Sequence, residues 1–390
     1  MRTIQQIDVR DQKVLVRCDF NVPLDKNGNI SDNFRILKTL PTINYLIEKN
    51  AKIILISHLG SPKGKDLKYS LRPVARELSR LLGREVLFLK DCIGSEVEKS
   101  VGKLEKRQVA LLENLRFYNE EKANDPVFAQ KLAKLADVFV QDGFAVCHRS
   151  HASTVGIPNL LPSAAGMLLE KEFKILSKAL EDPYRPLVAI VGGAKISTKI
   201  KVIKKFLEKA DHLLVGGKIA NTILAVKGIC VRDPLPQEAE EVLKDVEAIN
   251  LTDSKLHLPV DGIMSLADLN EKYLRSGAVG TVRREEEIFD VGPETINNFK
   301  NVISSAEMVI WNGPLGYSEI SPFEKSSLEI AKAIKKSGAF SIIGGGETVE
   351  FVTKIGMIED FNHVSTGGGA MLDFLSGDAL PGIEILKKEL

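Results

Sequence analysis

The feature that most constrains the fold of this chain is a regular alternation of short apolar runs with helix-length amphipathic stretches. The apolar runs lie at residues 14–20, 51–57, 85–89, 109–115 and 137–142 in the first half, and at 187–193, 212–217, 308–313, 339–346 and 363–369 in the second. Helical patterns such as those of residues 33–49 and 72–82 separate them. Strands that are apolar throughout and alternate with helices are typical of parallel sheets covered on both faces. The pattern therefore predicts an α/β protein with mainly parallel sheets.

The length of the chain indicates how many such sheets to expect. The chain has 390 residues, and at roughly 100–200 residues per domain two domains are favoured. A helix-like stretch at 164–182 marks the expected junction, because Pro158 and Pro162 precede it and Pro183 and Pro186 follow it. A helix bounded by prolines can act as a semi-rigid connector, and it can equally be an ordinary peripheral helix.

Charge is balanced over the whole chain but not within its two halves. Lys and Arg number 53 and Asp and Glu 52, and this near-neutrality gives no reason to expect nucleic acid or an anionic membrane as a partner. Residues 1–170 carry 26 basic and 20 acidic residues, a net +6, whereas residues 171–390 carry 27 and 32, a net −5. Such a difference can serve solubility alone, but it also suits a small anionic ligand held on one side.

Compartment and redox state follow from what the sequence lacks. No apolar run reaches the ~18–20 residues that span a bilayer, and the first residues show no apolar core of a signal peptide. Cys18, Cys92, Cys147 and Cys230 stand far apart, without a C-x-x-C pair or a partnering histidine cluster. This distribution argues against a zinc site or a disulfide framework. We therefore expect a soluble, cytoplasmic protein with free thiols.

Glycine clusters follow the apolar runs of the second half, each just before an expected helix. They are Gly192-Gly193, Gly216-Gly217, Gly313, Gly344-Gly345-Gly346 and Gly367-Gly368-Gly369. Glycine lets the backbone approach a ligand closely, and the following helix N-terminus offers free N–H donors. One such turn is weak evidence, but several at the carboxyl edge of one parallel sheet indicate a phosphate or nucleotide crevice. The spacing fits neither the P-loop nor the dinucleotide-binding fingerprint.

The first half instead places basic and polar side chains at or beyond the ends of its apolar runs. These side chains are Arg17, Asp19, Asn21, Arg35, His58, Arg116, His148, Arg149 and His151. Any single arginine can be a surface residue or a salt-bridge partner, but several at strand ends would hold a small polyanion through bidentate contacts. His148 and His151 lack a third ligand nearby and are weak evidence for a metal. No G-x-S-x-G elbow supports a nucleophilic triad.

Nine motifs run in order from one end of the chain to the other. They are RCDFNVPL (17–24), FRILKTLPTI (34–43), SHLG (57–60), LLENLRF (111–117), HRSHAS (148–153), GGAKIS (192–197), IWNGPLG (310–316), GGGET (344–348) and STGGGAMLDFLSG (365–377). Together they make the chain resemble the phosphoglycerate kinase family over essentially its whole length. The resemblance implies two Rossmann-like three-layer α/β/α domains with mainly parallel sheets, joined by a hinge helix. The first would span 1–165 with a tail at about 378–390 packed back on it, the connecting helix 166–184, and the second domain 185–377.

The resemblance also implies an activity. A glycolytic and gluconeogenic kinase of this family transfers a phosphoryl group reversibly between 1,3-bisphosphoglycerate and ADP, giving 3-phosphoglycerate and ATP. The first domain would bind the phosphoglycerate, and the second the nucleotide together with Mg²⁺. Phosphoryl transfer needs positioning and charge neutralisation more than covalent chemistry, so we expect direct in-line transfer after hinge closure. The implied protein is a cytoplasmic monomer with small-molecule substrates.

By position, the resemblance assigns roles to individual residues. Phosphoglycerate binding falls to Arg17, Asp19, Asn21, Arg35, His58, Leu59, Gly60, Ser61, Arg116 and Arg149. Nucleotide binding falls to Gly193, Lys195, Lys199, Gly216, Gly217, Asn312, Pro314, Glu319, Gly344, Gly345, Gly346, Glu347 and Thr348, with Glu347 facing the Mg²⁺ of the nucleotide. Arg35 and Lys199 would clamp the transferred group, with Gly345 and Gly368 as the backbone donors beside it.

The chain departs from the family pattern at five sensitive positions. Ser61 stands where an arginine is expected, and Thr198 where an aspartate is expected. Lys218 replaces a glycine, Ser318 an aromatic residue, and Glu347 an aspartate. We expect an active kinase with weaker phosphoglycerate binding because of Ser61, and with altered metal or nucleotide preference because of Lys218 and Glu347. The alternatives are neutral drift at each position, a non-catalytic nucleotide-binding homologue, and a kinase for a related small acid.

Overall fold

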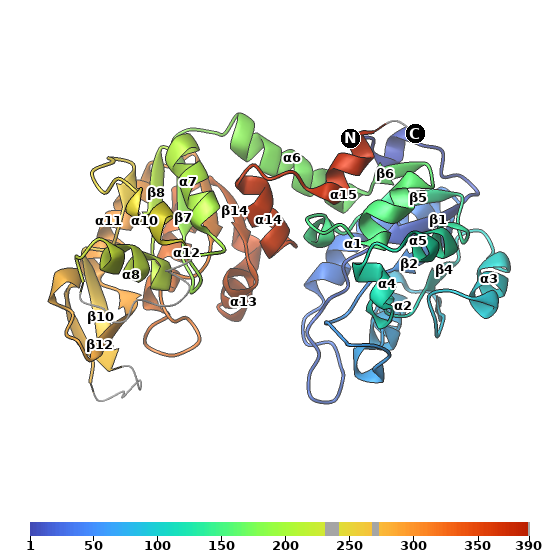
Figure 1. Ribbon diagram of the computed structural model, residues 1–390, viewed down its shortest axis with the longest axis horizontal. Helices are drawn as coiled ribbons and strands as arrows, with labels where there is room; N and C mark the ends of the chain where they lie inside the picture. The colour runs from blue at the N-terminus through green and yellow to red at the C-terminus, as the bar shows by residue number, and fades with distance from the viewer. Residues whose placement is uncertain (231–241, 267–272, 389–390) are drawn as a thin grey trace. The chain divides into compact units, whose positions relative to one another are not determined.

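A computed structural model describes residues 1–230, 242–266 and 273–388 of the chain. The chain forms two compact units (Figure 1). The first unit consists of Met1–Lys174 together with Ala379–Leu390, and the second of Ile175–Asp378. Each unit contains its own six-stranded parallel sheet, which confirms the predicted α/β class with two mainly parallel sheets.

The sheet of the first unit has the strand order β3-β4-β2-β1-β5-β6. Its strands are β1 (Lys13–Arg17), β2 (Lys52–Ile56), β3 (Val86–Phe88), β4 (Val109–Leu111), β5 (Val138–Gln141) and β6 (Ser163–Ala165). Strand β1 pairs with β2 on one side and with β5 on the other. The chain therefore changes direction across the sheet at β1, and in open α/β sheets ligands bind at the carboxyl ends of strands beside such a point.

Helices cover both faces of this sheet. They are α1 (Phe34–Glu48), α2 (Arg72–Leu82), α3 (Ser95–Gly102), α4 (Asn119–Lys122) and α5 (Pro126–Ala133), and the short α15 (Pro381–Glu384) returns from the C-terminal end of the chain. The backbone N–H of Gly382 donates to the carbonyl of Cys147 at 2.9 Å, which attaches this returning segment to the first unit.

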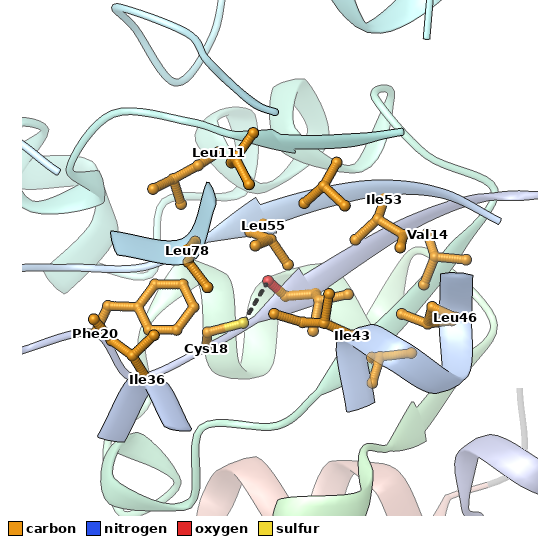
Figure 2. Close-up of a cluster of buried hydrophobic side chains, with 14 of the residues drawn as sticks. Val14, Cys18, Phe20, Ile36, Ile43, Leu46, Ile53, Leu55, Leu78 and Leu111 are labelled. Atoms are coloured by element: carbon orange, nitrogen blue, oxygen red, sulfur yellow. Dashed lines mark hydrogen bonds between the residues drawn. The ribbon is translucent and has the colours of Figure 1, made fainter. Parts of the chain in front are cut away.

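Successive residues of the strands enter different cores, because side chains alternate across a sheet. Val14 of β1 packs with α1 and α2 in one hydrophobic cluster (Figure 2), whereas Leu15 packs with α3 and α5 in another. Phe20, just beyond β1, and the Cys18 thiol also lie in the first cluster, and that thiol donates to the carbonyl of Val16 (Figure 2). Each buried aliphatic side chain stabilises the fold by about 1.5–3 kcal/mol relative to exposure. The near-continuous apolar runs thus fill two cores at once.

The sheet of the second unit has the order β15-β14-β13-β7-β8-β9. Its strands are β7 (Leu187–Val191), β8 (His212–Val215), β9 (Leu256–His257), β13 (Met308–Asn312), β14 (Phe340–Gly344) and β15 (His363–Val364). Among the described residues, the α-helices that lie wholly in this unit are α7 (Ile200–Lys209), α8 (Gly217–Val226), α10 (Leu243–Glu247), α11 (Pro293–Ser304), α12 (Lys325–Ser337), α13 (Gly346–Lys354) and α14 (Gly368–Leu375). Strand β7 pairs with β8 and with β13, so the direction of the chain changes here too.

The second unit also contains a three-stranded antiparallel sheet that the sequence pattern did not predict. It consists of β10 (Asp261–Leu266), β11 (Arg275–Ala278) and β12 (Glu286–Val291), with β10 in the centre. Its edge strand β11 alternates half-buried and exposed residues and contains Gly277. No apolar run therefore marked this part of the chain as a sheet.

The predicted junction carries helix α6, which runs from Met167 to Glu181. The division between the compact units falls within it, between Lys174 and Ile175. The predicted start of this helix was wrong by three residues, because Ala164 and Ala165 complete strand β6 instead. Among the described residues we find no helix that combines the length and the apolar character needed to cross a membrane.

Candidate functional site

Basic side chains gather at the carboxyl edge of the first sheet, where the sequence predicted an anion site. We call this group the basic cluster: Arg17, Arg35, His58, Arg116, Arg149 and His151. Arg17 ends strand β1, His58 follows β2, and Arg35 is the second residue of α1. The parallel topology brings them together, because β1 and β2 are neighbours that end at the same edge.

Arg17 is the innermost member of the basic cluster and is completely buried. Its Nε donates to Oγ of Ser153 at 2.8 Å, and its Nη1 donates to the carbonyl of Cys18. Its Nη2 lies 3.3 Å from Nδ1 of His58. The guanidinium is thus held rigidly by its own surroundings, so it contributes charge to the site from within the fold.

Arg35 is presented differently, on the surface side of the cluster. Its Nη1 donates to Oδ2 of Asp19 at 2.6 Å and to the carbonyl of Asn21 at 3.2 Å. The side chain of Arg35 is 31% exposed, whereas that of Asp19 is 3% exposed. Oδ1 of Asn21 in turn accepts from the N–H of Gly60 at 2.8 Å. Asp19 and Asn21 therefore orient an accessible guanidinium and tie it to the loop after β2.

Arg116 closes the cluster against that same loop. Its Nη1 donates to the carbonyl of Gly60 at 2.7 Å and to Oγ of Ser61 at 3.2 Å, while its Nε is buried without a hydrogen-bond partner. Gly60 has φ +61°, a conformation that favours glycine. Burial, together with the charges of Arg17 and Arg149, lowers the pKa of Arg116 to about 10. Leu59 is buried beside these groups, and its carbonyl accepts from Nδ2 of Asn114 at 2.8 Å.

The two histidines of the cluster are neutral at physiological pH. Burial, followed by the charges of Arg17, Arg116 and Arg35, holds the pKa of His58 well below its usual value. Burial and the same kind of repulsion, led by Arg17, lower the pKa of His151 to about 4. The charges of neighbouring arginines contribute to both shifts, and this indicates a site with little negative charge nearby.

The ion pairs of the cluster also show that it contains few negative charges. Asp19 pairs with Arg35, and the carboxylate of Glu121 lies 3.7 Å from Nδ1 of His151. In the part of the chain that the structure describes, Arg17, Arg116 and Arg149 form no ion pair. The arrangement can therefore hold a small polyanion, whose charges would complete the network.

The second unit places glycine loops, rather than arginines, at the carboxyl edge of its sheet. Lys199, at the start of α7, is the buried cation among them: its Nζ donates to the carbonyl of Gly192 at 2.6 Å and lies 3.5 Å from that of Asn312. Burial lowers the pKa of Lys199 to about 8, although the nearby charge of Glu347 acts in the opposite direction. The lysine thus joins the loop after β7 to the end of β13.

These loops approach one another so closely that side chains would not fit. Gly193 (φ +95°) and Gly313 (φ +94°) both have conformations that favour glycine. A Cβ at Gly313 would lie 2.2 Å from the carbonyl oxygen of Gly192 and 2.5 Å from Nζ of Lys199, and a Cβ at Gly217 would lie 2.8 Å from the nitrogen of Gly193. These contacts show that the glycine turns after β7, β8 and β13 lie close together, as the sequence predicted.

The loops after β14 and β15 meet in the same way. Gly345 has φ +97°, and a Cβ there would lie 3.1 Å from Nδ2 of Asn312. A Cβ at Gly368 would lie 3.0 Å from Cα of Gly345. Nδ2 of Asn312 is buried without a hydrogen-bond partner, whereas Oγ1 of Thr348 accepts from the N–H of Gly313 at 2.7 Å. A buried donor without a partner beside free backbone groups is suited to a phosphate oxygen.

Not every predicted glycine faces the open side of these loops. A Cβ at Gly216 would meet Cδ2 of Leu315 at 2.5 Å, and one at Gly344 would meet Sδ of Met371 at 2.2 Å. Both glycines are buried and allow neighbouring elements to pack closely. Gly346 stands apart from them, because a Cβ there would meet open space.

A cavity of about 250 Å³ opens beside these loops. It is lined by Gly193, Ala194, Gly217, Lys218, Ile288, Phe289, Pro314, Gly316, Tyr317, Glu319 and Glu347. The predicted site residues Gly193, Gly217, Pro314, Glu319 and Glu347 are therefore brought together, and Lys218 joins them. The exposed side chain of Lys195 does not line this cavity.

Sequence reasoning missed the apolar wall of this cavity. Ile288 and Phe289 belong to β12, and the ring of Phe289 stacks with that of Tyr317 at a centroid distance of 6.3 Å. Asn221 of α8 fixes this strand, because its Nδ2 donates to the carbonyl of Ile288 at 2.8 Å. The apolar pair between acidic residues at 286–290 was a signal for a strand, but nothing in the sequence connected that strand with the glycine loops.

The fit of a magnesium ion rests on Glu347. This carboxylate is exposed in the first turn of α13 and faces the cavity. Among the described residues there is no group of three or more His, Cys, Asp or Glu side chains that could hold a metal alone. Mg²⁺ commonly binds through one or two carboxylates plus substrate phosphates, and a carboxylate at this position suits that mode.

The family model, curated relatives and solved structures of high similarity name the same family. The phosphoglycerate kinase family model matches residues 4–378. A phosphoglycerate kinase of Moorella thermoacetica is 45% identical over 392 residues, which cover 99% of this chain and 99% of that protein. One of Aquifex aeolicus is 43% identical and covers 97% and 96%. The solved phosphoglycerate kinases of Coxiella burnetii (TM-score 0.86, 38% identity) and Pyrococcus horikoshii OT3 (TM-score 0.87, 32% identity) each cover 99% of this chain and 98% of their own.

Proposed function

The chain belongs to the phosphoglycerate kinase family, and from this premise we propose how its residues carry out the reaction. It is a transferase that moves a phosphoryl group reversibly between 1,3-bisphosphoglycerate and ADP, giving 3-phosphoglycerate and ATP in glycolysis and gluconeogenesis. The family membership does not favour a non-catalytic homologue or a kinase for another acid.

We propose that the first unit binds the phosphoglycerate at the basic cluster. The observation that carries this proposal is the set of three arginines, Arg17, Arg116 and Arg149, that have no ion-pair partner among the described residues. A doubly charged phosphate and a carboxylate on one small molecule supply the missing negative charges. Arg35 and Arg149 are accessible for direct contact, while the buried Arg17 adds charge from behind.

The nucleotide is assigned to the cavity and glycine loops of the second unit. The apolar wall of Ile288, Phe289 and Tyr317 suits a flat base, and backbone N–H groups at the starts of α8, α13 and α14 suit phosphates. Asn312 offers a buried donor without a partner at the point where these loops meet. We propose that Lys195, which lies outside the cavity wall, reaches the phosphates from its exposed position.

The transfer itself needs positioning and neutralisation of charge. Arg35 on the phosphoglycerate side and Lys199 on the nucleotide side stabilise the charge of the moving group, and the backbone groups of Gly345 and Gly368 add donors. The carboxylate released from an acyl phosphate is a weak base, so no general acid is required. Both ligands must meet with water excluded, so turnover passes through a state in which the two units bring their ligands together. Glu347 would hold Mg²⁺ together with the nucleotide phosphates, and the ion would supply further neutralisation of charge.

Three departures from the family pattern modify this account. Ser61 accepts a hydrogen bond from Arg116 and brings no charge of its own, so we propose weaker phosphoglycerate binding. Lys218 lines the nucleotide cavity, where it adds a cation, and Glu347 presents its carboxylate one methylene further from the backbone than an aspartate does. We propose that these two residues change the nucleotide and metal preference.

We further propose that the protein acts in the cytoplasm as a monomer on small molecules, without nucleic acid or membrane partners. Cys18, Cys92, Cys147 and Cys230 are free and buried, which suits a reducing compartment. The formal net charge of +1 over the whole chain gives no long-range attraction to polyanions.

The proposed reaction is tested by coupling the formation of ADP from ATP and 3-phosphoglycerate to an indicator reaction. We expect turnover that requires both substrates and Mg²⁺. Nucleotide binding without any turnover would contradict the proposed function and would support the non-catalytic alternative. Faster turnover with a glycerate analogue than with 3-phosphoglycerate would reassign the substrate.

A further inference from the structure

The start of helix α6 is held by two buried side chains from other elements. The first N–H groups of a helix have no partner inside it and need one elsewhere. Here the N–H of Met167 donates to Oγ1 of Thr42 at 2.9 Å, and that of Leu168 donates to Oδ1 of Asp142 at 3.0 Å. The N–H of Leu169 lies within 3.5 Å of the same oxygen. Thr42 and Asp142 therefore cap α6 together.

Asp142 is fixed at the same time to the basic cluster. It follows directly after strand β5, and its backbone N–H donates to the carbonyl of Arg17 at 2.9 Å. Its side chain is completely buried. A Cβ at Gly166 would lie 2.2 Å from Oδ1 of Asp142, so α6 approaches the carboxylate as closely as glycine allows. One residue thus joins the innermost arginine of the cluster to the first turn of α6.

Thr42 makes the corresponding connection for the second arginine. It lies on α1, two helical turns after Arg35, and is completely buried. Helix α1 presents Arg35 near its first turn and anchors α6 through Thr42. The elements that carry Arg17 and Arg35 are therefore both attached to the start of α6, which is the segment that continues into the second unit.

A cap alone does not require a charged group at this position. Asparagine and serine cap helices about as well as aspartate does, whereas full burial of a carboxylate is costly. Oδ2 of Asp142 has no hydrogen-bond partner, so the cost is only partly offset by contacts. What the side chain adds is a fixed orientation, because its one accepting oxygen receives two neighbouring helix N–H groups while the backbone of the same residue holds β1.

We propose that Asp142 is a positioning residue that holds Arg17 and the start of α6 in one geometry, and that its loss weakens binding of phosphoglycerate far more than binding of nucleotide. The inference rests on the proposed function, because it takes the basic cluster as the phosphoglycerate site. It goes beyond it, because Asp142 is completely buried and would act through Arg17 and α6 rather than by contact with a ligand.

The test compares steady-state kinetics of Asp142→Ala, Asp142→Asn and a matched variant of the other unit. Asp290 is suited to this comparison, because it is also a buried carboxylate that caps a helix: its Oδ2 accepts from the N–H of Ser326, in the first turn of α12, at 3.0 Å. We expect Asp142→Ala to raise KM for 3-phosphoglycerate at least about tenfold and KM for ATP less than about twofold, since small displacements of binding groups have effects of this size.

The conservative variant and the matched control separate positioning from simple stability. Asp142→Asn keeps the shape and an accepting oxygen, so its KM for 3-phosphoglycerate should return to within about threefold of the wild type. Asp290→Ala should leave that KM unchanged. A residue with a purely structural role would lower the folded fraction, and with it the apparent kcat, in Asp142→Ala without moving either KM.

The outcomes that overturn the inference are distinct from failure of the proposed function. If the wild type shows no turnover of 3-phosphoglycerate, the proposed function fails, and this inference fails with it. If the wild type is active but folded Asp142→Ala has wild-type KM values, only the inference is overturned. Should Asp142→Ala not fold, Thr42→Val replaces it: we expect KM for 3-phosphoglycerate to rise about threefold, and an unchanged KM in the folded variant overturns the inference.

Discussion

The basic cluster of the first unit and the glycine loops of the second differ in the groups that they offer to an anionic ligand. In the proposed reaction, both hold phosphate oxygens at the carboxyl edge of a parallel sheet. The cluster uses guanidinium groups that are fixed by other side chains, as Asp19 fixes Arg35. The loops use glycines that let backbone segments approach one another where side chains would not fit, as at Gly217 and Gly313, with Lys199 as a buried cation beside them.

The difference teaches which substitutions each site tolerates. The basic cluster depends on its charge, because burial and the charges of neighbouring arginines lower the pKa values of Arg116 and His58. A change of charge should therefore shift phosphoglycerate affinity strongly. The glycine loops depend on space, because a single added carbon would collide with neighbouring backbone. A change of volume should shift nucleotide affinity even when no charge is altered.

The largest expected effect is on catalysis and comes from Lys199→Ala. Lys199 is the buried cation of the loops, and loss of one transition-state donor typically lowers kcat by about 10²–10³. We expect KM for ATP to change only a few-fold, because the backbone groups remain. Steady-state kinetics measures both values, and a kcat within a few-fold of the wild type would show that Lys199 has no role at the transferred group.

A smaller but selective effect is expected from Gly313→Ala. The added Cβ would lie 2.2 Å from the carbonyl oxygen of Gly192 at a residue with φ +94°. Strain of about 2 kcal/mol predicts that Kd for ATP rises about 30-fold, with 3-phosphoglycerate binding unchanged. Gly102→Ala in α3, where a Cβ meets open space, is the control. Equal ATP affinity in Gly313→Ala and the control would show that close packing at Gly313 is not needed for ATP binding.

Restoring charge to the basic cluster should have a more moderate effect. Ser61→Arg adds a guanidinium where the family pattern has one, and a charge-assisted contact is worth about 1.5–3 kcal/mol. Repulsion from Arg116, which contacts Ser61, reduces that gain, so we expect KM for 3-phosphoglycerate to fall about tenfold. Ser61→Gln, which is long but uncharged, serves as the control. A KM that stays the same or rises in Ser61→Arg would show that the remaining arginines already saturate the site.

The smallest expected effect is on stability and its dependence on pH. Burial raises the pKa of Asp142 to about 7 and that of Asp290, in the other unit, to about 7 as well. The folded protein therefore keeps a proton that the unfolded chain has released, and the stability that this proton provides is lost as pH rises through 7. From pH 6 to pH 8, Asp142→Asn should gain about 1 kcal/mol in unfolding free energy relative to the wild type.

Denaturant titration at the two pH values measures this difference, and comparison with the wild type cancels the titration of His58 and His151, which acts in the opposite direction. Asp290→Asn should behave alike, since its carboxyl has the same raised pKa for the same reason. If the gap between either variant and the wild type is the same at pH 6 and pH 8, the buried carboxyl does not titrate in this range.

Much of the fold could be predicted because its signals are local. Apolar runs such as 51–57 predicted β2, and the rule that parallel strands end at one edge predicted that Gly193, Gly217 and Gly313 would meet. What escaped prediction depends on tertiary contacts. The sheet of β10, β11 and β12 lacks a continuous apolar run, so Phe289 was not linked to the cavity beside the glycine loops.

Burial is the other property that the sequence did not reveal. Arg17 looked like any arginine at the end of a strand, yet it is completely buried, and its guanidinium contacts Ser153, Cys18 and His58. Asp142 carried no motif of its own, and its position beneath α6 appears only when β5, α1 and α6 are assembled. Residue type and spacing indicate which groups are available, whereas packing decides which of them face a ligand.

The division of the two ligands between the two units is tested most directly by crossed calorimetric titrations of Arg149→Ala and Lys195→Ala. Both side chains are exposed, and in the described part of the chain neither makes a hydrogen bond or an ion pair, so neither variant should disturb the fold. We predict that Arg149→Ala weakens 3-phosphoglycerate binding about 10- to 100-fold and leaves ATP binding within twofold, while Lys195→Ala does the reverse. Equal loss of both ligands in either variant, or a loss of the wrong ligand, would contradict the account.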